Sequence, residues 1–493
     1  VNVPVWNPEN CIQCNRCSYV CPHAVIRPVA LTEEEAANAP QTLEMTGLKQ
    51  YKFAIAVSAL DCTGCGSCVN VCPGKKGAKA LAMENMEANI EMQKFFDYSV
   101  TLPEKEDVIA KFKENTVKGS QFKQPLLEFS GACAGCGETP YAKLITQLFG
   151  DRMYIANATG CSSIWGNSSP STPYTVNAKG QGPAWDNSLF EDNAEFGYGM
   201  LLAQKAIREG LKAKVEAVAA NEKASEEVKA ACQEWLDTYT VGATNGAATD
   251  KLVAALEGID CDVCKDIVKN KDFLAKKSQW IFGGDGWAYD IGFGGVDHVL
   301  ASGKDINIMV FDTEVYSNTG GQSSKSTPTG AIAQFAAGGK EVKKKDMASI
   351  AMSYGYVYVA QISMGADFNQ TVKAIAEAEA YPGPSLIIAY APCINHGIKK
   401  GMSKAQTEEE LAVKCGYWHN FRFNPEAESK FTLDSKAPTE DYQAFLDGEV
   451  RYNSLKRSNP EKAARLFALN EEQAKARYEY LNKLVTLYGK TEE

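Results

Sequence analysis

Two runs of four cysteines, each closed by a Cys-Pro pair, occupy the amino-terminal part of the chain. Thiolates are soft ligands that suit iron-sulfur clusters, and in this spacing the fourth cysteine of each run binds the cluster held mainly by the other run. Zinc also takes four thiolates, but zinc ribbons use separated cysteine pairs. The spacing therefore predicts two [4Fe-4S] clusters and a role in electron transfer. The expected ligand sets are Cys11, Cys14, Cys17 and Cys72 for one cluster, and Cys62, Cys65, Cys68 and Cys21 for the other.

A Gly-Asp-Gly triplet centred on Asp285 follows a short apolar segment, and a polar, glycine-rich segment runs from Asp312 to Gly321. Glycines let backbone N–H groups approach a pyrophosphate closely, and oxygen ligands bind the Mg²⁺ that neutralises it. Asp285 would supply a carboxylate to the metal, and Thr313 and the backbone carbonyl of Val315 would supply further oxygens. Asn318 would place its amide beside the pyrophosphate or the reacting centre.

Together the two segments resemble the thiamine pyrophosphate motif, in which a Gly-Asp-Gly triplet is followed at a distance by an asparagine. The triplet alone is ordinary in turns, but the pair of segments is specific. We therefore predict a site for Mg²⁺ and thiamine pyrophosphate, with Asn318 as its candidate catalytic residue. The cofactor-binding residues expected in these segments are Gly284, Asp285, Gly286, Trp287, Thr313, Glu314, Val315, Tyr316, Ser317 and Asn318.

Four more cysteines stand far apart in the sequence, and their spacing alone leaves open whether they are ligands or buried free thiols. They are Cys133, Cys136, Cys161 and Cys393. Cys261 and Cys264 form a separate Cys-x-x-Cys pair. Because no second pair accompanies it, unligated thiols are favoured over a redox or metal pair.

From end to end the chain resembles the carboxyl-terminal part of the pyruvate:ferredoxin oxidoreductase family. The resemblance rests on two long and unusual segments, GACAGCGETP from Gly131 to Pro140 and DTEVYSNTGGQSSKSTPTG from Asp312 to Gly330. By this resemblance the four separated cysteines hold a third [4Fe-4S] cluster close to the thiamine, and Glu138 and Cys161 border the cofactor. The resemblance likewise puts Mg²⁺ on Asp285, Thr313 and Val315.

The activity that this resemblance implies is the oxidative decarboxylation of pyruvate with coenzyme A to acetyl-coenzyme A and CO₂. The thiamine C2 carbanion would add to the keto carbon, and electrons would leave singly through three clusters to ferredoxin or flavodoxin. In the family, the glutamate that activates the thiamine ring and most of the coenzyme A site belong to an amino-terminal region that is absent here. We therefore expect half of an active site, completed by a separate chain or a longer parent polypeptide, in a homodimer of the complete enzyme.

Three other functions remain open from the sequence. The nearest is a related 2-oxoacid oxidoreductase that acts on 2-oxoglutarate, a branched-chain oxoacid or an aryl pyruvate. A second is an electron-transfer module whose thiamine domain is a non-catalytic scaffold. A third is a non-redox thiamine decarboxylase with structural clusters. Three potential clusters beside one thiamine would form a continuous electron path, which favours the pyruvate oxidoreductase.

The elements that must position these residues fall into two domains. Residues 1–104 are predicted to be an α+β two-[4Fe-4S] ferredoxin-like domain with an inserted loop from Leu31 to Tyr51. A charged, lysine-rich linker is expected at 105–124. Short apolar runs that alternate with helical periods predict a doubly wound α/β thiamine pyrophosphate-binding domain over 125–493. Within it we expect a helical insertion at about 201–277 and a helical tail at about 460–488 that docks on a neighbouring chain.

Composition limits the partners and the cellular compartment that can be expected for the protein. The chain has 493 residues, a formal net charge of -10 and a pI of about 5.3, which argues against nucleic acid or an anionic membrane as partner. A local basic patch could still receive an acidic ferredoxin. Cluster ligands must stay reduced, so we expect a reducing, anaerobic cytoplasm. The chain begins with Val and shows neither a signal peptide nor a membrane span, so we expect a processed chain or a piece of a longer polypeptide.

Overall fold

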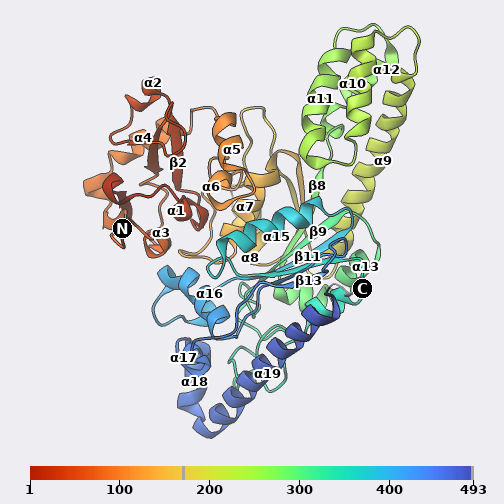
Figure 1. The fold of residues 1–493 in the computed structure, drawn as a ribbon. Helices are drawn as coiled ribbons and strands as arrows, with labels where there is room; N and C mark the ends of the chain where they lie inside the picture. Colours follow the sequence, from red (N-terminus) through yellow and green to blue (C-terminus); the bar gives the residue numbers. More distant parts are fainter. Residues whose placement is uncertain (169–171, 490–493) are drawn as a thin grey trace.

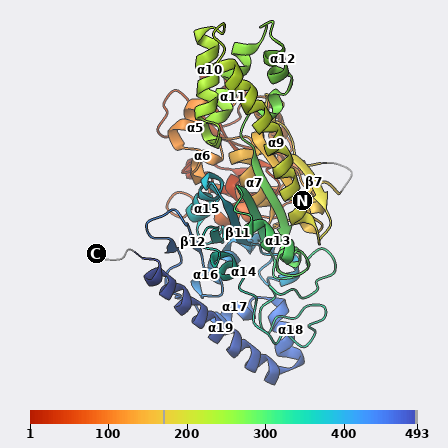
Figure 2. The same ribbon diagram turned by 90° about the vertical axis from the view of Figure 1, so that its right-hand side faces the viewer.

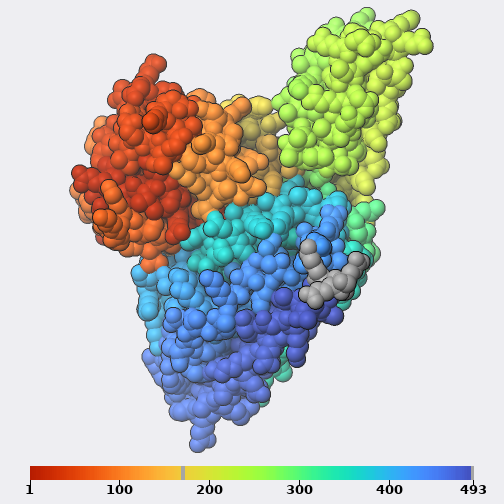
Figure 3. All heavy atoms as spheres, in the orientation of Figure 1, coloured from red at the N-terminus to blue at the C-terminus, as the bar shows by residue number. Residues whose placement is uncertain are grey.

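The computed structural model describes residues 1–168 and 172–489. It has three regions, which Figure 1 colours along the sequence. An amino-terminal region, in red and orange, carries both cysteine runs and packs against a central α/β region, while a helical arm projects from the other side (Figure 1, Figure 3). Among the described residues no helix is both long and apolar enough to cross a membrane.

Two small antiparallel sheets form the amino-terminal region. β1 (Asn2–Trp6) pairs with β5 (Leu81–Asn85), which joins the start of the region to its end. The second sheet has the order β2-β4-β3 and packs with α4 (Met92–Ser99) around the fully buried Phe53. The other elements here are α1 (Arg16–Tyr19), β2 (Ile26–Leu31), α2 (Glu33–Ala36), β3 (Leu43–Glu44), β4 (Lys52–Val57) and α3 (Ser67–Val71).

The two cysteine runs adopt the same local backbone. Gln13 and Asn15 have φ angles of 56° and 61°, and their counterparts in the second run, Gly64 and Gly66, have φ angles of 70° and 77°. In both runs the N–H two residues after the first cysteine donates to that cysteine's sulfur at 3.4 Å. The sequence repeat is therefore a structural repeat, and these N–H donors favour the thiolate form that a cluster requires.

The segment between the runs is more ordered than the predicted loop. Thr32 accepts a hydrogen bond from the N–H of Glu35, whose carboxylate accepts one from the N–H of Thr32, so a capping box starts α2. Further on, β3 pairs with β4. The insertion thus contributes one helical turn and one strand to the amino-terminal region.

The predicted linker, residues 105–124, also contains helices, α5 (Glu106–Phe112) and α6 (Val117–Ser120). Its charged side chains, which suggested a linker, lie on the exposed side of α5. Val108, however, is fully buried in the core of the amino-terminal region, and Ser120 is fully buried as well. The segment is therefore an ordered connection that packs on the regions it joins.

An eight-stranded sheet with the order β13-β12-β10-β11-β9-β8-β6-β7 forms the centre of the molecule. The pairs from β10 to β7 are parallel, and β12 and β13 add antiparallel pairs at one edge. The central strands are buried on both faces, which explains their continuous apolar runs. Their bounds are β6 (Met153–Ala158), β7 (Ala184–Ser188), β8 (Ser278–Gly284), β9 (Ile306–Asp312), β10 (Tyr358–Ile362), β11 (Pro384–Tyr390), β12 (Phe421–Phe423) and β13 (Phe431–Leu433).

Helices cover both faces of this sheet, which confirms the predicted doubly wound α/β fold. One face packs on α7 (Thr139–Phe149) and α15 (Phe368–Ala380), and it also receives Tyr19 and Val20 of the amino-terminal region. The other face packs on α13 (Phe293–Ala301), α14 (Met347–Met352) and the carboxyl-terminal helices. Further helices are α8 (Cys161–Ser163), α16 (Ala405–Lys414), α17 (Tyr442–Asp447) and α18 (Val450–Ser458).

The helical arm has a core of its own, with Trp235 and Leu252 fully buried in it. Its first helix begins at Asn193, before the predicted start at residue 201, because the first turns of this helix pack on β6 and β8. Figure 2 shows this helix leaving the sheet and running into the arm. The arm helices are α9 (Asn193–Ala219), α10 (Glu226–Asp237), α11 (Gly242–Leu256) and α12 (Asp262–Lys269).

The tail forms one helix, α19 (Pro460–Leu487), close to the predicted bounds. The expectation that this tail docks on a neighbour stays a prediction. Its apolar stripe, which includes Leu466, Phe467, Leu481 and Leu484, is buried in the core of the same chain. The helix packs against α17, α18 and β13. The apolar face of this amphipathic helix is therefore buried within the chain.

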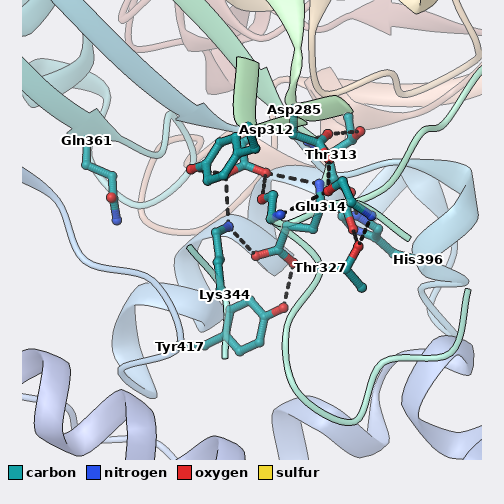
Figure 4. Close-up of polar contacts among 12 residues, drawn as sticks. Asp285, Asp312, Thr313, Glu314, Thr327, Lys344, Gln361, His396 and Tyr417 are labelled. Atoms are coloured by element: carbon teal, nitrogen blue, oxygen red, sulfur yellow. Dashed lines mark hydrogen bonds and ion pairs between the residues drawn. The ribbon is translucent and has the colours of Figure 1, made fainter. Parts of the chain in front are cut away.

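Buried charges hold the loop that follows β9. Arg451 on α18 donates to Glu314 at 2.8 Å and to Glu449 at 2.6 Å, and all three side chains are buried. Lys344 bridges Glu314 and Asp312, each at 2.9 Å (Figure 4). Burial acts to raise the pKa of Glu314, but Lys344 and Arg451 outweigh burial and lower that pKa to about 2. The loop is thereby tied to α18 by paired charges.

Arg451→Met would remove one cation from this network while keeping an unbranched side chain. We expect the free energy of unfolding to fall by ~3–5 kcal/mol, because Glu314 and Glu449 would stay buried without their shared partner. The matched control is Lys456→Met, which breaks an exposed pair with Asp447 and should cost less than about 1 kcal/mol. Urea unfolding followed by circular dichroism measures both losses. Equal losses would mean that the buried network contributes no more than a surface ion pair.

Candidate functional site

Four predicted site residues follow four neighbouring strands at the same edge of the sheet. Cys161 comes after β6, Asp285 after β8, Thr313 after β9 and Cys393 after β11. These strands are adjacent and parallel in the order β11-β9-β8-β6. Their carboxyl ends therefore meet at one edge, which is where ligands bind in open α/β sheets.

Asp285, Thr313 and Val315 form one oxygen-rich cluster at this edge, and Figure 4 shows the first two of them. The backbone N–H of Thr313 donates to Asp285 Oδ1 at 3.2 Å, and its hydroxyl lies 3.0 Å both from that oxygen and from the Val315 carbonyl oxygen. Ser324, which was not predicted, donates its hydroxyl to Asp285 Oδ2 at 2.5 Å. Thr313 is thus in contact with both of the other predicted metal ligands.

The chemistry of this cluster fits a hard divalent cation. Asp285 is buried, and burial, together with the nearby Asp312 carboxylate, raises its pKa to about 8. A buried carboxylate is costly unless it is paired with a cation. A carboxylate, a hydroxyl and a backbone carbonyl are also oxygen donors of the kind that Mg²⁺ takes.

The other predicted residues of the two segments lie in different surroundings. The Trp287 indole is fully buried in the main core, and the Glu314 carboxylate accepts from Lys344 in the ion network. Gly286 lies directly against the ring of Tyr316, and Asn318 is exposed. Of these residues, Asn318 is therefore the one open to a molecule that approaches from outside.

Thiols from three separate segments gather beside this cluster. The Sγ of Cys161 lies 3.0 Å from the Oγ of Ser317. Burial is the main cause that raises the pKa of Cys161, and Cys136 and Cys393 raise it further because they lie close by. Cys393 in turn interacts with Cys133, the most exposed of the four predicted ligands. The structure thus brings together residues that are far apart in the sequence.

A close backbone approach makes this meeting possible. The N–H of Gly137 donates to the Pro392 carbonyl at 3.1 Å, and a Cβ at this glycine would lie 2.5 Å from the Pro392 nitrogen. Any larger residue would therefore push the Cys136 segment away from the Cys393 segment. The backbone N–H of Glu138 donates to the Cys136 sulfur at 3.4 Å, and its carboxylate accepts from the Trp165 indole at 2.7 Å. Burial raises the pKa of this carboxyl to about 7.

Two small cavities lie in the amino-terminal region. Each is lined by three cysteines of one run and the fourth cysteine of the other, as the sequence predicts. Apolar side chains such as Ile55 and Met83 complete the walls. The first cavity is lined by Cys11, Cys14, Cys17 and Cys72, and the second by Cys62, Cys65, Cys68 and Cys21.

Two histidines of the site escaped the sequence analysis. His23 lines the second cavity, and its Nε2–H donates to the carbonyl of Ala132, beside Cys133, at 2.9 Å. His396 Nε2 donates to the carbonyl of Thr313 at 2.6 Å. Each histidine lies close in sequence to a predicted cysteine ligand, but no known motif spacing relates a histidine to these cysteines. The hydrogen bonds of the two histidines are therefore visible only in the folded structure.

Two family descriptions match the chain. Residues 10–76 match the 4Fe-4S dicluster domain. Residues 268–389, which include Asp285 and Thr313, match the thiamine pyrophosphate enzyme, C-terminal TPP binding domain. The first match covers both cysteine runs, and the second covers the oxygen-rich cluster at the edge of the sheet.

Similar curated proteins extend these matches over almost the whole chain. The chain is 56% identical over 98% of its length to pyruvate-flavodoxin oxidoreductase of Klebsiella pneumoniae, of which it covers 42%. It is equally similar, over the same shares, to pyruvate:ferredoxin oxidoreductase of Moorella thermoacetica. It is 47% identical to mitochondrial pyruvate dehydrogenase [NADP(+)] of Euglena gracilis, over 98% of this chain and 27% of that protein.

The chain thus spans less than half the length of each of these relatives. Its first region carries the dicluster match and its central region the thiamine match, in that order along the sequence. This chain therefore comprises a 4Fe-4S dicluster domain followed by a thiamine pyrophosphate-binding domain, and it matches one part of the pyruvate-flavodoxin and pyruvate:ferredoxin oxidoreductases.

Proposed function

We propose that this chain is the thiamine-binding and electron-transferring part of an enzyme that converts pyruvate and coenzyme A to acetyl-coenzyme A and CO₂. The observation that carries the proposal is the meeting of Asp285 and Thr313 with Cys161 and Cys393 at one edge of the sheet. A site for a thiamine cofactor and a set of cluster ligands would then be immediate neighbours. Ferredoxin or flavodoxin would receive the electrons.

Asp285, Thr313 and Val315 would hold Mg²⁺, and the metal would hold the pyrophosphate of the cofactor. When bound, thiamine pyrophosphate supplies a carbanion that attacks the oxoacid and accepts the electrons left after CO₂ departs. The buried carboxylate of Asp285 supports this assignment, because among the described residues it forms no ion pair, whereas Glu314 pairs with Lys344 and Arg451. Asn318 would contact the reacting molecule from the open side.

Three cysteine sets would form the electron path. The set of Cys133, Cys136, Cys161 and Cys393 would lie next to the thiamine. His23 connects this set to the second cavity, since its other ring nitrogen, Nδ1, lies 3.5 Å from the hydroxyl of Thr63 in the wall of that cavity. Cys68 of the second cavity interacts with Cys17 of the first. The path would therefore run from the thiamine to the second cavity and then to the first.

The complete reaction would need groups from outside this chain, because the chain spans 42% of the Klebsiella and Moorella relatives. A further segment or chain would supply the group that activates the thiamine ring, the substrate carboxylate site and most of the coenzyme A site. We propose that the complete enzyme is a homodimer in a reducing, anaerobic cytoplasm, where twelve cluster thiolates would remain reduced.

Cys133→Ser should remove the cluster nearest the thiamine and leave the other two. Anaerobic iron analysis should then fall from about twelve to about eight irons per chain, on the stoichiometry of three [4Fe-4S] clusters. The control is Cys415→Ser, which changes a buried cysteine outside the three sets and should keep the full iron content. Electron paramagnetic resonance spectra should retain both signals of the amino-terminal region. Loss of one of those signals would contradict the ligand assignment.

Asp285→Asn should weaken thiamine pyrophosphate binding at fixed Mg²⁺ while sparing the clusters. We expect the affinity to fall at least about tenfold, equivalent to about 1.4 kcal/mol, because the metal loses its charged protein ligand. Asp297→Asn is a matched control, since Asp297 on α13 accepts a hydrogen bond from Tyr354 and is none of the predicted metal ligands. Titration calorimetry of the complete enzyme measures both affinities, and an unchanged affinity for Asp285→Asn would refute the metal site.

The function itself is tested by pyruvate-dependent reduction of ferredoxin. We expect none from this chain alone, even with clusters, Mg²⁺, thiamine pyrophosphate and coenzyme A, because the group that activates the thiamine ring is missing. Adding the remainder of the enzyme should restore activity, and chemically reduced chain should reduce ferredoxin in either case. An inactive complete enzyme would contradict the proposed reaction. Full activity of the chain alone would contradict only the division of the active site.

A further inference from the structure

Three cysteines lie in the helical arm, apart from the proposed cluster ligands. Cys232 on α10 and Cys264 on α12 are buried in the arm core, with 0% and 3% of their surface exposed. Cys261, immediately before α12, packs at the border of the same core and remains partly exposed. The arm thus contains a Cys-x-x-Cys pair with one accessible and one buried thiol.

The pair is built into the start of α12. Cys261 is the N-cap residue of this eight-residue helix, and its sulfur accepts a hydrogen bond from the backbone N–H of Cys264 at 3.4 Å. The thiol of Cys264 also contacts the sulfur of Cys261. Residues three apart at the start of a helix lie on one face, with a spacing between Cα atoms that a disulfide can bridge.

The surroundings make the two thiols chemically different. The N–H of Cys264, followed by the Cys264 thiol, lowers the pKa of Cys261, whereas burial raises the pKa of Cys264 to about 11. The more exposed sulfur is therefore the better nucleophile, and the buried one is protected until its neighbour has reacted. Two equivalent free thiols would not show this difference in pKa and exposure.

We propose that Cys261 and Cys264 form a reversible dithiol–disulfide centre, which exchanges with small aliphatic disulfides at the surface of the arm. The alternative is that both cysteines are unreactive thiols in the core of the arm. Two observations favour the reactive pair over that alternative: Cys261 is the partly exposed N-cap residue of α12, and its sulfur is in direct contact with Cys264.

The exchange takes two steps. The Cys261 thiolate attacks the small disulfide, which forms a mixed disulfide and releases one small thiolate. Cys264 then gives its proton to solvent and attacks the Cys261 sulfur, which closes the protein disulfide and releases the second small thiolate. Two protein thiols are oxidised and one small disulfide is reduced to two thiols, and their protons balance. No other oxidant is required.

The local charge favours an uncharged reactant. Asp260 and Asp262 flank Cys261, and Asp260 pairs with Lys265. An anionic disulfide would meet these carboxylates, whereas a neutral one would not. Hydroxyethyl disulfide, which carries no charge, is therefore the probe of choice, and cluster thiols elsewhere are held by iron in the loaded protein.

The test treats the full cluster-loaded chain with hydroxyethyl disulfide under nitrogen, blocks remaining thiols with N-ethylmaleimide and analyses the peptides by mass spectrometry. We expect a disulfide between Cys261 and Cys264, fully reversed by dithiothreitol. Cys264→Ser should instead retain a mixed disulfide on Cys261. Cys261→Ser should lose all reaction in this peptide. Should serine at the buried position unfold the arm, Cys264→Ala provides the same readout in an apolar form.

Matched variants separate the pair from other thiols. Cys232→Ala and Cys415→Ser should form the Cys261–Cys264 disulfide as the unaltered chain does, because neither residue takes part in the exchange. Alkylation of both Cys261 and Cys264 after treatment would overturn the proposal. A mixed disulfide that persists on Cys261 in the unaltered chain, or a disulfide that joins Cys264 to Cys232, would overturn it as well.

Discussion

Parallel pairing of neighbouring strands is the constraint on which the rest of this structure depends. In the sheet, β11, β9, β8 and β6 lie side by side and point the same way, so the loops that follow them must meet at one edge. An antiparallel partner in this series would have sent one loop to the opposite end. Cys161 and Cys393 thus owe their proximity to strand direction, although more than two hundred residues of chain separate them.

The charges around two buried carboxylates, Glu314 and Asp285, give these residues different roles. Glu314 is buried among Lys344, Arg451 and Tyr417, and these groups keep it ionised as part of the framework. Asp285 is equally buried but has hydroxyl and N–H partners instead of a lysine or arginine in direct contact. Lysine and arginine therefore neutralise Glu314, which holds the loop after β9. The Asp285 carboxylate would be neutralised by a metal ion instead.

Local spacing determined how much of this could be predicted from the sequence. The cysteine runs specify their own loops, so the two ligand sets around the cavities followed from spacing alone. Cys161 and Cys393 meet only through the sheet, and no local pattern links them; resemblance to a family supplied that pairing. The ion pairs of Glu314 with Lys344 and Arg451 could not be predicted, because the three residues are far apart in the sequence. Amphipathicity predicted the apolar stripe of the tail, but it does not identify the elements that bury the stripe.

Part of the amino-terminal region is buried in the hydrophobic core of the central region. Tyr19 and Val20 of the amino-terminal region are buried against α7 and α15, and the Tyr19 hydroxyl donates to the Phe368 carbonyl at 3.0 Å. Buried Lys143 donates to the Ser18 carbonyl across the same boundary. Separating the regions would expose these side chains to water. Electrons would therefore cross by tunnelling over a fixed gap rather than by the swing of a tethered carrier, and solvent viscosity should have no influence on this step.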